Sequence, residues 1–189
     1  MMTRRSLLLC AALLLVPLGA FAQEAPPTPK PNFQEYNDDA MHFVAPPSYH
    51  PVGQHRVSLD DLSEDPQVVA AWVSGDAARP KKMLIQMQSY EGPLDGFEAT
   101  YEQVLRNAFG DALIRDKERT SLKNGMPAVY FEMTEGTGFE AATMYVYCWV
   151  DGVRGVALSV TAQVGEMNSA TAKQLLSDAS AVQYPRDRG

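Results

Sequence analysis

Three neighbouring stretches decide the fold: residues 128–134 (AVYFEMT), 141–150 (AATMYVYCWV) and 155–163 (GVALSVTAQ). They are rich in Val, Tyr and Thr, which favour strands, and short segments containing glycine separate them. Strands that are joined by such short turns pair antiparallel. The three stretches therefore predict a three-stranded meander.

Outward from the meander, the spacing of apolar residues predicts further strands and helices. The expected strands are residues 40–45, 67–74 and 82–90, and the expected helical segments are residues 58–62, 94–109 and 168–180. Strands outnumber helices, and most of them follow one another through short turns. We expect an α+β domain in which helices flank a mostly antiparallel sheet.

The N-terminus has the pattern of a secretory signal peptide. Arg4 and Arg5 form a basic start, an apolar stretch follows, and Ala20-Phe21-Ala22 offers a cleavage site. We therefore expect residues 1–22 to be removed and the protein to be exported, as a periplasmic or secreted protein. The paired arginines fit both a Sec signal and the twin-arginine (Tat) pattern, so both export routes stay open.

Composition divides the rest of the chain. Residues 23–39 contain four prolines among polar residues and predict a disordered linker, residues 40–185 are the size of one domain, and residues 186–189 form a tail. Of the 16 Lys and Arg residues, two lie in the signal and all 23 acidic residues lie after it, so the processed chain has a net charge of −9. This charge argues against nucleic acid as a partner and against adsorption to anionic membranes, and we expect no membrane insertion after cleavage.

Several motifs occur in a fixed order: residues 41–49 (MHFVAPPSY), a central helix from Leu94, residues 124–128 (NGMPA), residues 150–152 (VDG) and a closing helix. This order resembles the PsbP/Mog-like superfamily, which includes extrinsic photosystem subunits, a Ran-binding nuclear transport factor and DcrB-type bacterial envelope proteins. The resemblance implies an α-β-α sandwich over roughly residues 40–185. It implies no catalytic residue, because members of the superfamily bind different partners.

The meander also predicts a candidate surface, because successive side chains of a strand point to opposite faces. One face is apolar, whereas the other is aromatic and polar, and Tyr and Trp often serve recognition. The alternative is that helices cover this face, with Phe97 and Tyr101 packed on it. The candidate partner or ligand residues are Tyr130, Glu132, Tyr145, Tyr147 and Trp149.

Other chemistry in the chain is sparse. His42, His50 and His55 lie in one N-terminal region with nearby acids and are weak candidates for a metal site. Cleavage after Ala22 leaves Cys148 as the single cysteine, and its place on the apolar strand face predicts an inert, buried thiol. We expect no cofactor.

Three functions remain open from the sequence. The first is a non-enzymatic binding or assembly module of the bacterial envelope type, whose partner is an unknown protein or small ligand. The second is a metal-dependent or hydrolytic enzyme that uses the region of His42, His50 and His55. The third is a structural envelope or stress protein without a ligand.

Overall fold

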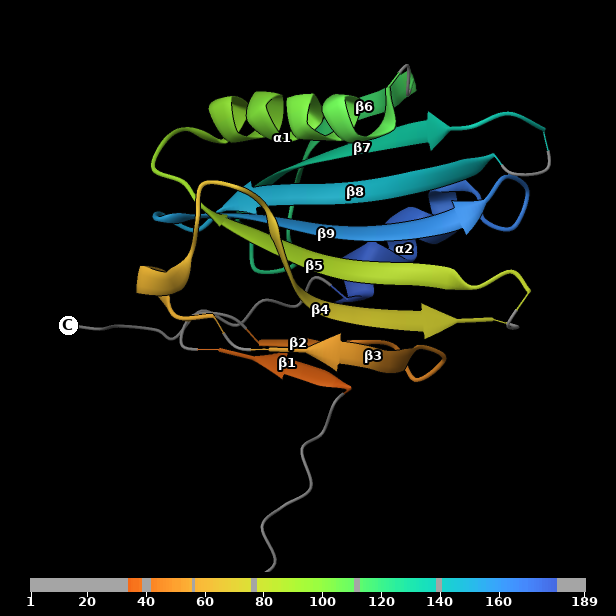
Figure 1. Cartoon of the computed structure of the whole chain (residues 1–189), viewed down its shortest axis with the longest axis horizontal. Helices are drawn as coiled ribbons and strands as arrows, with labels where there is room; N and C mark the ends of the chain where they lie inside the picture. Colours follow the sequence, from red (N-terminus) through yellow and green to blue (C-terminus); the bar gives the residue numbers. More distant parts are fainter. Residues whose placement is uncertain are drawn as a thin grey trace, which may run out of the picture. The chain divides into compact units, whose positions relative to one another are not determined.

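An antiparallel sheet forms the centre of the fold (Figure 1). The computed structural model describes residues 34–38, 42–55, 57–75, 78–110, 113–138 and 141–179. Seven of the described strands pair in the order β3-β4-β5-β9-β8-β7-β6, and each neighbouring pair is antiparallel. These strands are β3 (His50–Gln54), β4 (Gln67–Ser74), β5 (Lys81–Ser89), β6 (Leu113–Ser121), β7 (Pro127–Glu135), β8 (Ala142–Val150) and β9 (Arg154–Gln163). The predicted meander is the β7-β8-β9 part of this sheet.

Within the described residues, α1 (Leu94–Phe109) packs on β7 and β8, and α2 (Ser169–Ala179) packs on β8 and β9. Tyr101 of α1 contributes to one core cluster with Phe131, whereas Leu176 of α2 contributes to another with Tyr130. Since residues 130 and 131 point to opposite faces of β7, the two helices cover opposite faces of the sheet. In Figure 1, α2 is accordingly seen partly behind the strands.

The structure confirms an α+β class with a mostly antiparallel sheet. The bounds of β4 and α1 are those predicted. β8 and β9 differ from the prediction by one residue at one end, and β5 and β7 differ by one residue at each end. The short helical turn is a 3-10 helix, η1 (Leu59–Asp61). In the described part of the chain, neither α-helix combines the length and apolar character that a membrane span requires.

The sequence prediction missed both edge strands of the sheet. β6 contains five consecutive charged residues, 115–119, and a bulge, and its side chains are mostly exposed. β3 contains Pro51 and Gly53 and another bulge. Edge strands often have charges, proline and bulges, which oppose pairing with other chains, and they lack the apolar alternation that predicts a strand.

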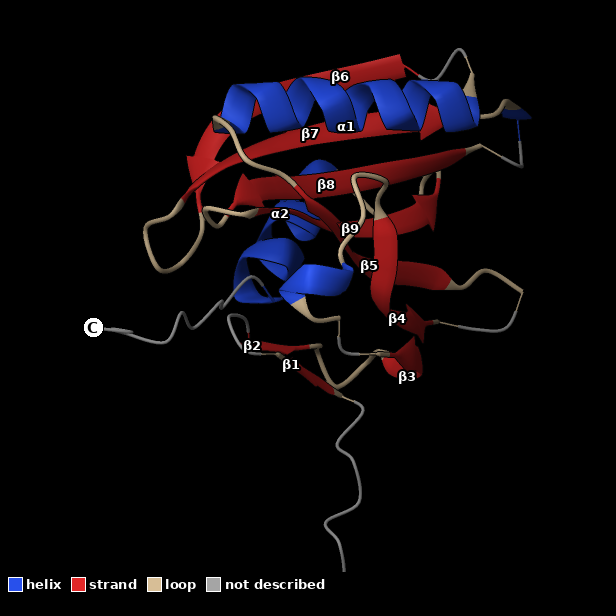
Figure 2. Ribbon diagram, turned by 60° about the vertical axis from the view of Figure 1, so that its left-hand side comes forward, coloured by secondary structure: helices blue, strands red, loops and turns tan. Residues whose placement is uncertain are grey.

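The N-terminal part of the described chain forms a separate pair of strands, β1 (Glu35–Asn37) and β2 (His42–Val44), which Figure 2 shows apart from the large sheet. The side-chain amide of Gln34 donates to three backbone oxygens that follow β2. The aromatic side chains of Tyr36 and Phe43 are buried in the core. The acceptors of the Gln34 amide are the oxygens of Ala45 (3.1 Å), Pro46 (2.9 Å) and Tyr49 (2.7 Å).

The prediction that residues 23–39 form a disordered linker is therefore wrong for residues 34–38, which belong to the fold. An aromatic side chain that packs into the core and a backbone ladder with β2 offset the entropy of ordering this segment. The rest of that linker, the predicted signal peptide (residues 1–22) and the tail (residues 186–189) lie outside the described residues.

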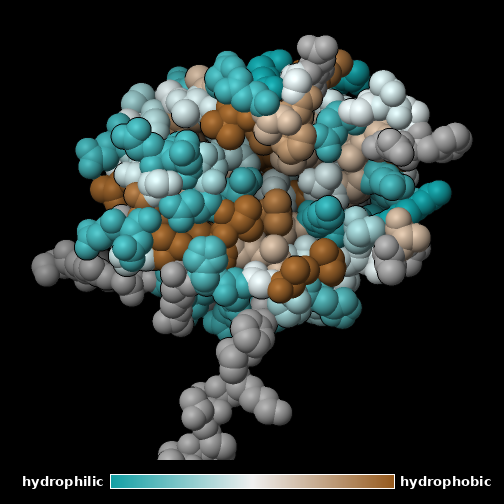
Figure 3. Space-filling model, in the orientation of Figure 1, coloured by the Kyte–Doolittle hydropathy of each residue, from teal (hydrophilic) through white to brown (hydrophobic). Residues whose placement is uncertain are grey.

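The surface is mixed rather than uniformly polar. Figure 3 shows hydrophobic side chains in brown among hydrophilic ones in teal, with a brown group in the middle and lower part of this face. Single exposed apolar residues are normal on soluble domains. Within the described ranges, the large apolar side chains that are exposed are Val44, Val52, Val68, Phe109, Leu113, Val153 and Val164.

Candidate functional site

All five predicted partner residues lie on the same face of β7 and β8, and all are buried. The exposed fractions of Tyr130, Glu132, Tyr145, Tyr147 and Trp149 are between 0 and 8%. Of the two alternatives, the covered face is the one that the structure shows, so these residues form no open surface. Their cover is different from the predicted one, because side chains of α2 and of the N-terminal strands complete this core cluster, whereas Phe97 and Tyr101 pack on the opposite face.

The register of β7 and β8 brings four of the five together. Tyr130 lies directly opposite Tyr147, and Glu132 lies opposite Tyr145. The rings of Tyr130 and Tyr147 meet edge to face, with their centroids 5.3 Å apart. Trp149 lies opposite Ala128, on the far side of the Tyr130 pair from Glu132. We call Tyr130, Glu132, Tyr145 and Tyr147 the tyrosine–glutamate cluster.

Hydrogen bonds fix the polar groups of this cluster. The hydroxyl of Tyr130 donates to Oε1 of Glu132 at 2.6 Å, which is the length of a charge-assisted bond. The hydroxyl of Tyr145 donates to the backbone oxygen of Met167, at 2.9 Å, just before α2. The tyrosine–glutamate cluster thus has polar contacts as well as apolar ones with the segment that covers it.

Two charged side chains connect the cluster to the surface. Glu118 lies on the edge strand β6, directly opposite Tyr130. Lys173 reaches over the cluster from α2, with its Nζ 2.8 Å from Oε1 of Glu118 and 4.5 Å from the centroid of the Tyr130 ring. The exposed fractions of these two side chains are 33% for Lys173 and 48% for Glu118. The geometry at Tyr130 is that of a cation–π contact.

The environment keeps the tyrosines neutral and Lys173 charged. Burial, the hydrogen bond to Glu132 and its negative charge raise the pKa of Tyr130 far above the ordinary value. Burial and the charge of Glu118 raise the pKa of Tyr147, although the positive charge of Lys173 opposes this. The pKa of Lys173 is raised in turn, first by its bond to Glu118. At neutral pH the cluster therefore holds an ammonium group beside neutral phenols.

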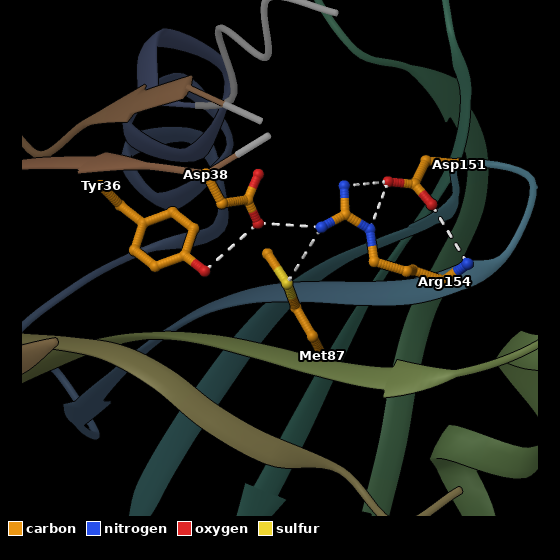
Figure 4. A network of polar contacts seen from close by, with 5 residues as sticks. All are labelled: Tyr36, Asp38, Met87, Asp151 and Arg154. Carbon is orange, nitrogen blue, oxygen red and sulfur yellow. Dashed lines mark hydrogen bonds and ion pairs between the residues drawn. The ribbon is translucent and has the colours of Figure 1, made fainter. Parts of the chain in front are cut away.

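A second polar network lies where the N-terminal segment meets the β8-β9 turn (Figure 4). Arg154 donates through Nε to Asp151 (2.8 Å) and through Nη1 to Asp38 (2.8 Å), while the backbone amide of Arg154 also donates to Asp151 (3.1 Å). The hydroxyl of Tyr36 donates to Asp38 at 3.3 Å, and Nη1 lies 3.9 Å from the sulfur of Met87. The charged side chains are at most 4% exposed.

This network has a structural role in the fold. Asp38 and Arg154 are 116 residues apart in the chain, so their ion pair joins the N-terminal segment to β9, a central strand of the sheet. Burial opposes the charge of Arg154, but bonds to Asp151 and Asp38 outweigh it and raise the pKa of the guanidinium. Buried ion pairs of this kind set the position of one segment on another more than they add net stability.

The described histidine side chains of the predicted metal-site region do not come together. His50 and His55 are exposed, one at the start of β3 and one just after its end. Since a strand rises about 3.3 Å per residue, the Cα atoms of the two lie roughly 16 Å apart, too far for the side chains to share a metal ion. The side chain of His42 lies outside the described part. Among the described residues, no group of three or more His, Cys, Asp and Glu side chains could hold a metal ion.

Cys148 is buried on the α1 face of β8, as predicted. Burial, followed by the negative charges of Glu98 and Glu102, raises the pKa of the thiol to about 12. Lys117 forms ion pairs with both of these glutamates, one of which, Glu98, is buried. A thiol in this environment stays protonated at neutral pH and is a poor nucleophile.

The same burial predicts alkaline instability. The pKa of Cys148 rises from 9.0 to about 12, and burial raises that of Tyr49 from 10.0 to about 12. Because the folded pKa is the higher one, the unfolded chain loses these protons first, so stability that is complete below about pH 8.5 falls as the pH rises towards 12. Urea unfolding at pH 8, 9.5 and 11 should show a falling midpoint, with a shallower fall between pH 8 and 9.5 for Cys148→Ala. An unchanged midpoint up to pH 11 would contradict this.

Sequence reasoning missed the charged members of both networks. The turn Asp151-Gly152 followed by Arg154 could have indicated the local pair of Asp151 and Arg154. By contrast, Glu118 and Lys173 come from separate elements, and their meeting depends on how α2 lies on the sheet. Comparison with known proteins adds no further assignment, since the chain matches no family model and no curated protein.

Proposed function

We propose that this protein is an exported, non-enzymatic binding or assembly module of the bacterial envelope type, acting in the periplasm or outside the cell. The observation that carries the proposal is the charged rim above the buried tyrosine–glutamate cluster, formed by Glu118 and Lys173, whose side chains are 48% and 33% exposed. The rim and the cluster gather aromatic rings, a carboxylate and a bound ammonium group near the β6 edge of the sheet. A half-exposed carboxylate and a partly exposed ammonium group beside a fixed aromatic ring suit recognition of a charged partner, because these two groups reach the surface.

The proposal includes an α-β-α sandwich of the PsbP/Mog-like type. Its support is the placement of the motifs: residues 124–125 form the β6-β7 turn, and residues 151–152 form the β8-β9 turn. Two helices on opposite faces of an antiparallel sheet agree with that architecture. This resemblance supports a binding role by analogy of fold.

Capture of partners from an envelope extract tests the proposal. The bait is the processed chain. Its intact mass should correspond to a chain that starts at Gln23. We expect wild type to cross-link a partner near the β6 edge, Glu118→Lys to lose it, and Glu91→Lys, a charge reversal at another exposed glutamate, to retain it. An unrelated acidic exported protein serves as the control bait. If the wild-type bait captures no protein that the control bait does not also capture, the binding role is contradicted.

A further inference from the structure

Lys173 resembles a ligand seated in a site that other elements build. Its ammonium group contacts Glu118 from β6 and the ring of Tyr130 from β7, and the charge of Glu132 also raises its pKa. We propose that this place is a cation-binding site for a lysine side chain of a protein partner, and that Lys173 occupies it until the partner displaces it. The inference rests on the proposed binding function and names its ligand chemistry.

The site is complete without Lys173. The register of the sheet sets Glu118, Tyr130 and Tyr147 in one row across β6, β7 and β8. Tyr130 is locked by its bond to Glu132 and by its edge-to-face contact with Tyr147. A ring that is fixed in this way presents its negative face in a constant place, which is what a cation–π contact needs.

Lys173 can leave the site without movement of α2. The helix is anchored by Ala172 and Leu176, which are buried in the core, and the segment before it by the bond from Tyr145 to the Met167 oxygen. The lysine side chain is one-third exposed, and its partner Glu118 is about half exposed. Ion pairs at such positions contribute little to stability, and the lysine stem has several freely rotating bonds. Displacement therefore needs only a change of side-chain rotamer.

The charge and position of the site favour a basic protein segment. The processed chain has a net charge of −9, which attracts basic partners and disfavours acidic ones. The site borders β6, which is an edge strand of the described sheet, so a segment lying along that edge could insert a side chain. Residues 115–119 of β6 are all charged and include a bulge, which opposes backbone pairing and leaves side-chain contacts as the means of recognition.

A titration with a small amine tests this site directly. The probe is Nα-acetyl-lysine amide, added to the processed full-length chain and followed by NMR, with the uncharged Nα-acetyl-norleucine amide as its match. Lys173→Ala should bind the lysine probe about tenfold more tightly than wild type, since it removes the competing ammonium. Chemical-shift changes should map to Glu118, Tyr130 and Tyr147.

Two further variants keep the test decisive. Lys82→Ala removes an exposed lysine from β5. By strand parity, Lys82 lies on the same face as Gln86, which is the face that α1 covers, so this variant should bind the probe as wild type does. If the alanine variant at 173 does not fold, Lys173→Gln keeps the shape and removes the charge, and it should also bind more tightly than wild type. Equal probe binding by wild type and the Lys173 variants, equal binding of the norleucine probe, or shifts confined to another surface would each overturn the inference.

The outcomes separate this inference from the proposed function. If the lysine probe fails while partner capture succeeds, the cation site is wrong and the binding module stands. If the probe binds but no partner is captured, the site stands and the wider function falls. A purely structural role of Lys173 predicts lower stability of Lys173→Ala with no gain in probe binding.

Discussion

Replacing Arg154 by methionine is expected to lower the free energy of unfolding by about 3–5 kcal/mol. The reason is that Asp38 and Asp151 would keep their buried carboxylates without the guanidinium that now binds both. Methionine fills a similar volume, so the loss reports the charge rather than a cavity. Urea unfolding followed by the fluorescence of the buried tryptophans measures the change.

Matched variants separate the network from a general effect of losing an arginine. Arg115→Met removes an exposed arginine on β6 and should change stability by less than about 0.5 kcal/mol. Adding Asp38→Asn and Asp151→Asn to Arg154→Met should recover part of the loss, because no unpaired charge then remains. A loss below about 1 kcal/mol for Arg154→Met alone would show that water or rearrangement satisfies the two carboxylates.

The central part of the fold could be predicted because its sequence signals are local. Residues 128–163 contain three runs of strand-forming residues between clear turns, and residues 94–109 show a helical stripe that ends at Gly110. Each signal depends on neighbours within about ten positions. The antiparallel α+β class follows from these signals without any knowledge of long-range contacts.

The strands that the sequence did not predict form because of their position in the tertiary structure. β6 tolerates five consecutive charges because it is an edge, and β1 lies in a stretch whose prolines suggested a linker. Nothing in residues 34–38 indicates that Tyr36 will be buried or that Asp38 will reach an arginine 116 residues later. These contacts belong to tertiary structure, which overrides local composition.

The sequence predicted which residues of the candidate site lie together, but it did not decide whether they are exposed. Strand parity placed Tyr130, Glu132, Tyr145 and Tyr147 on one face, and the register brought them together. Whether that face is open depends on α2 and the N-terminal strands, which cover it. The same cover supplies Lys173, so the functional interest moves from the buried rings to the charged rim at β6.

On the opposite face of the sheet, we expect Phe97→Ala to lower the free energy of unfolding by about 3–5 kcal/mol. The ring of Phe97 is buried between Tyr90 and Tyr101, with centroid distances of 5.3 and 6.0 Å. It lies directly over Gly155 of β9, where a methyl group would come closer than 3.0 Å to three ring carbons. The glycine is thus required by the close approach of the ring.

A double-mutant cycle tests that contact. Gly155→Ala alone should cost about 1–3 kcal/mol, because the neighbours on both sides of the Phe97 ring limit its escape. In the Phe97→Ala background the same methyl group enters space that the ring has left, so its cost should fall to near zero. Urea unfolding of the four proteins gives the coupling energy, expected at about 1–3 kcal/mol.

Additive losses, within about 0.5 kcal/mol, would mean that the cost of the methyl group at residue 155 does not come from the Phe97 ring. The cycle therefore measures how rigidly α1 is seated on β9. If α1 is rigid, its ion pairs with β6, from Glu98 and Glu102 to Lys117, also hold the edge strand in place. The position of Glu118, one residue further along β6, would then depend on packing on the α1 face as well as on Lys173.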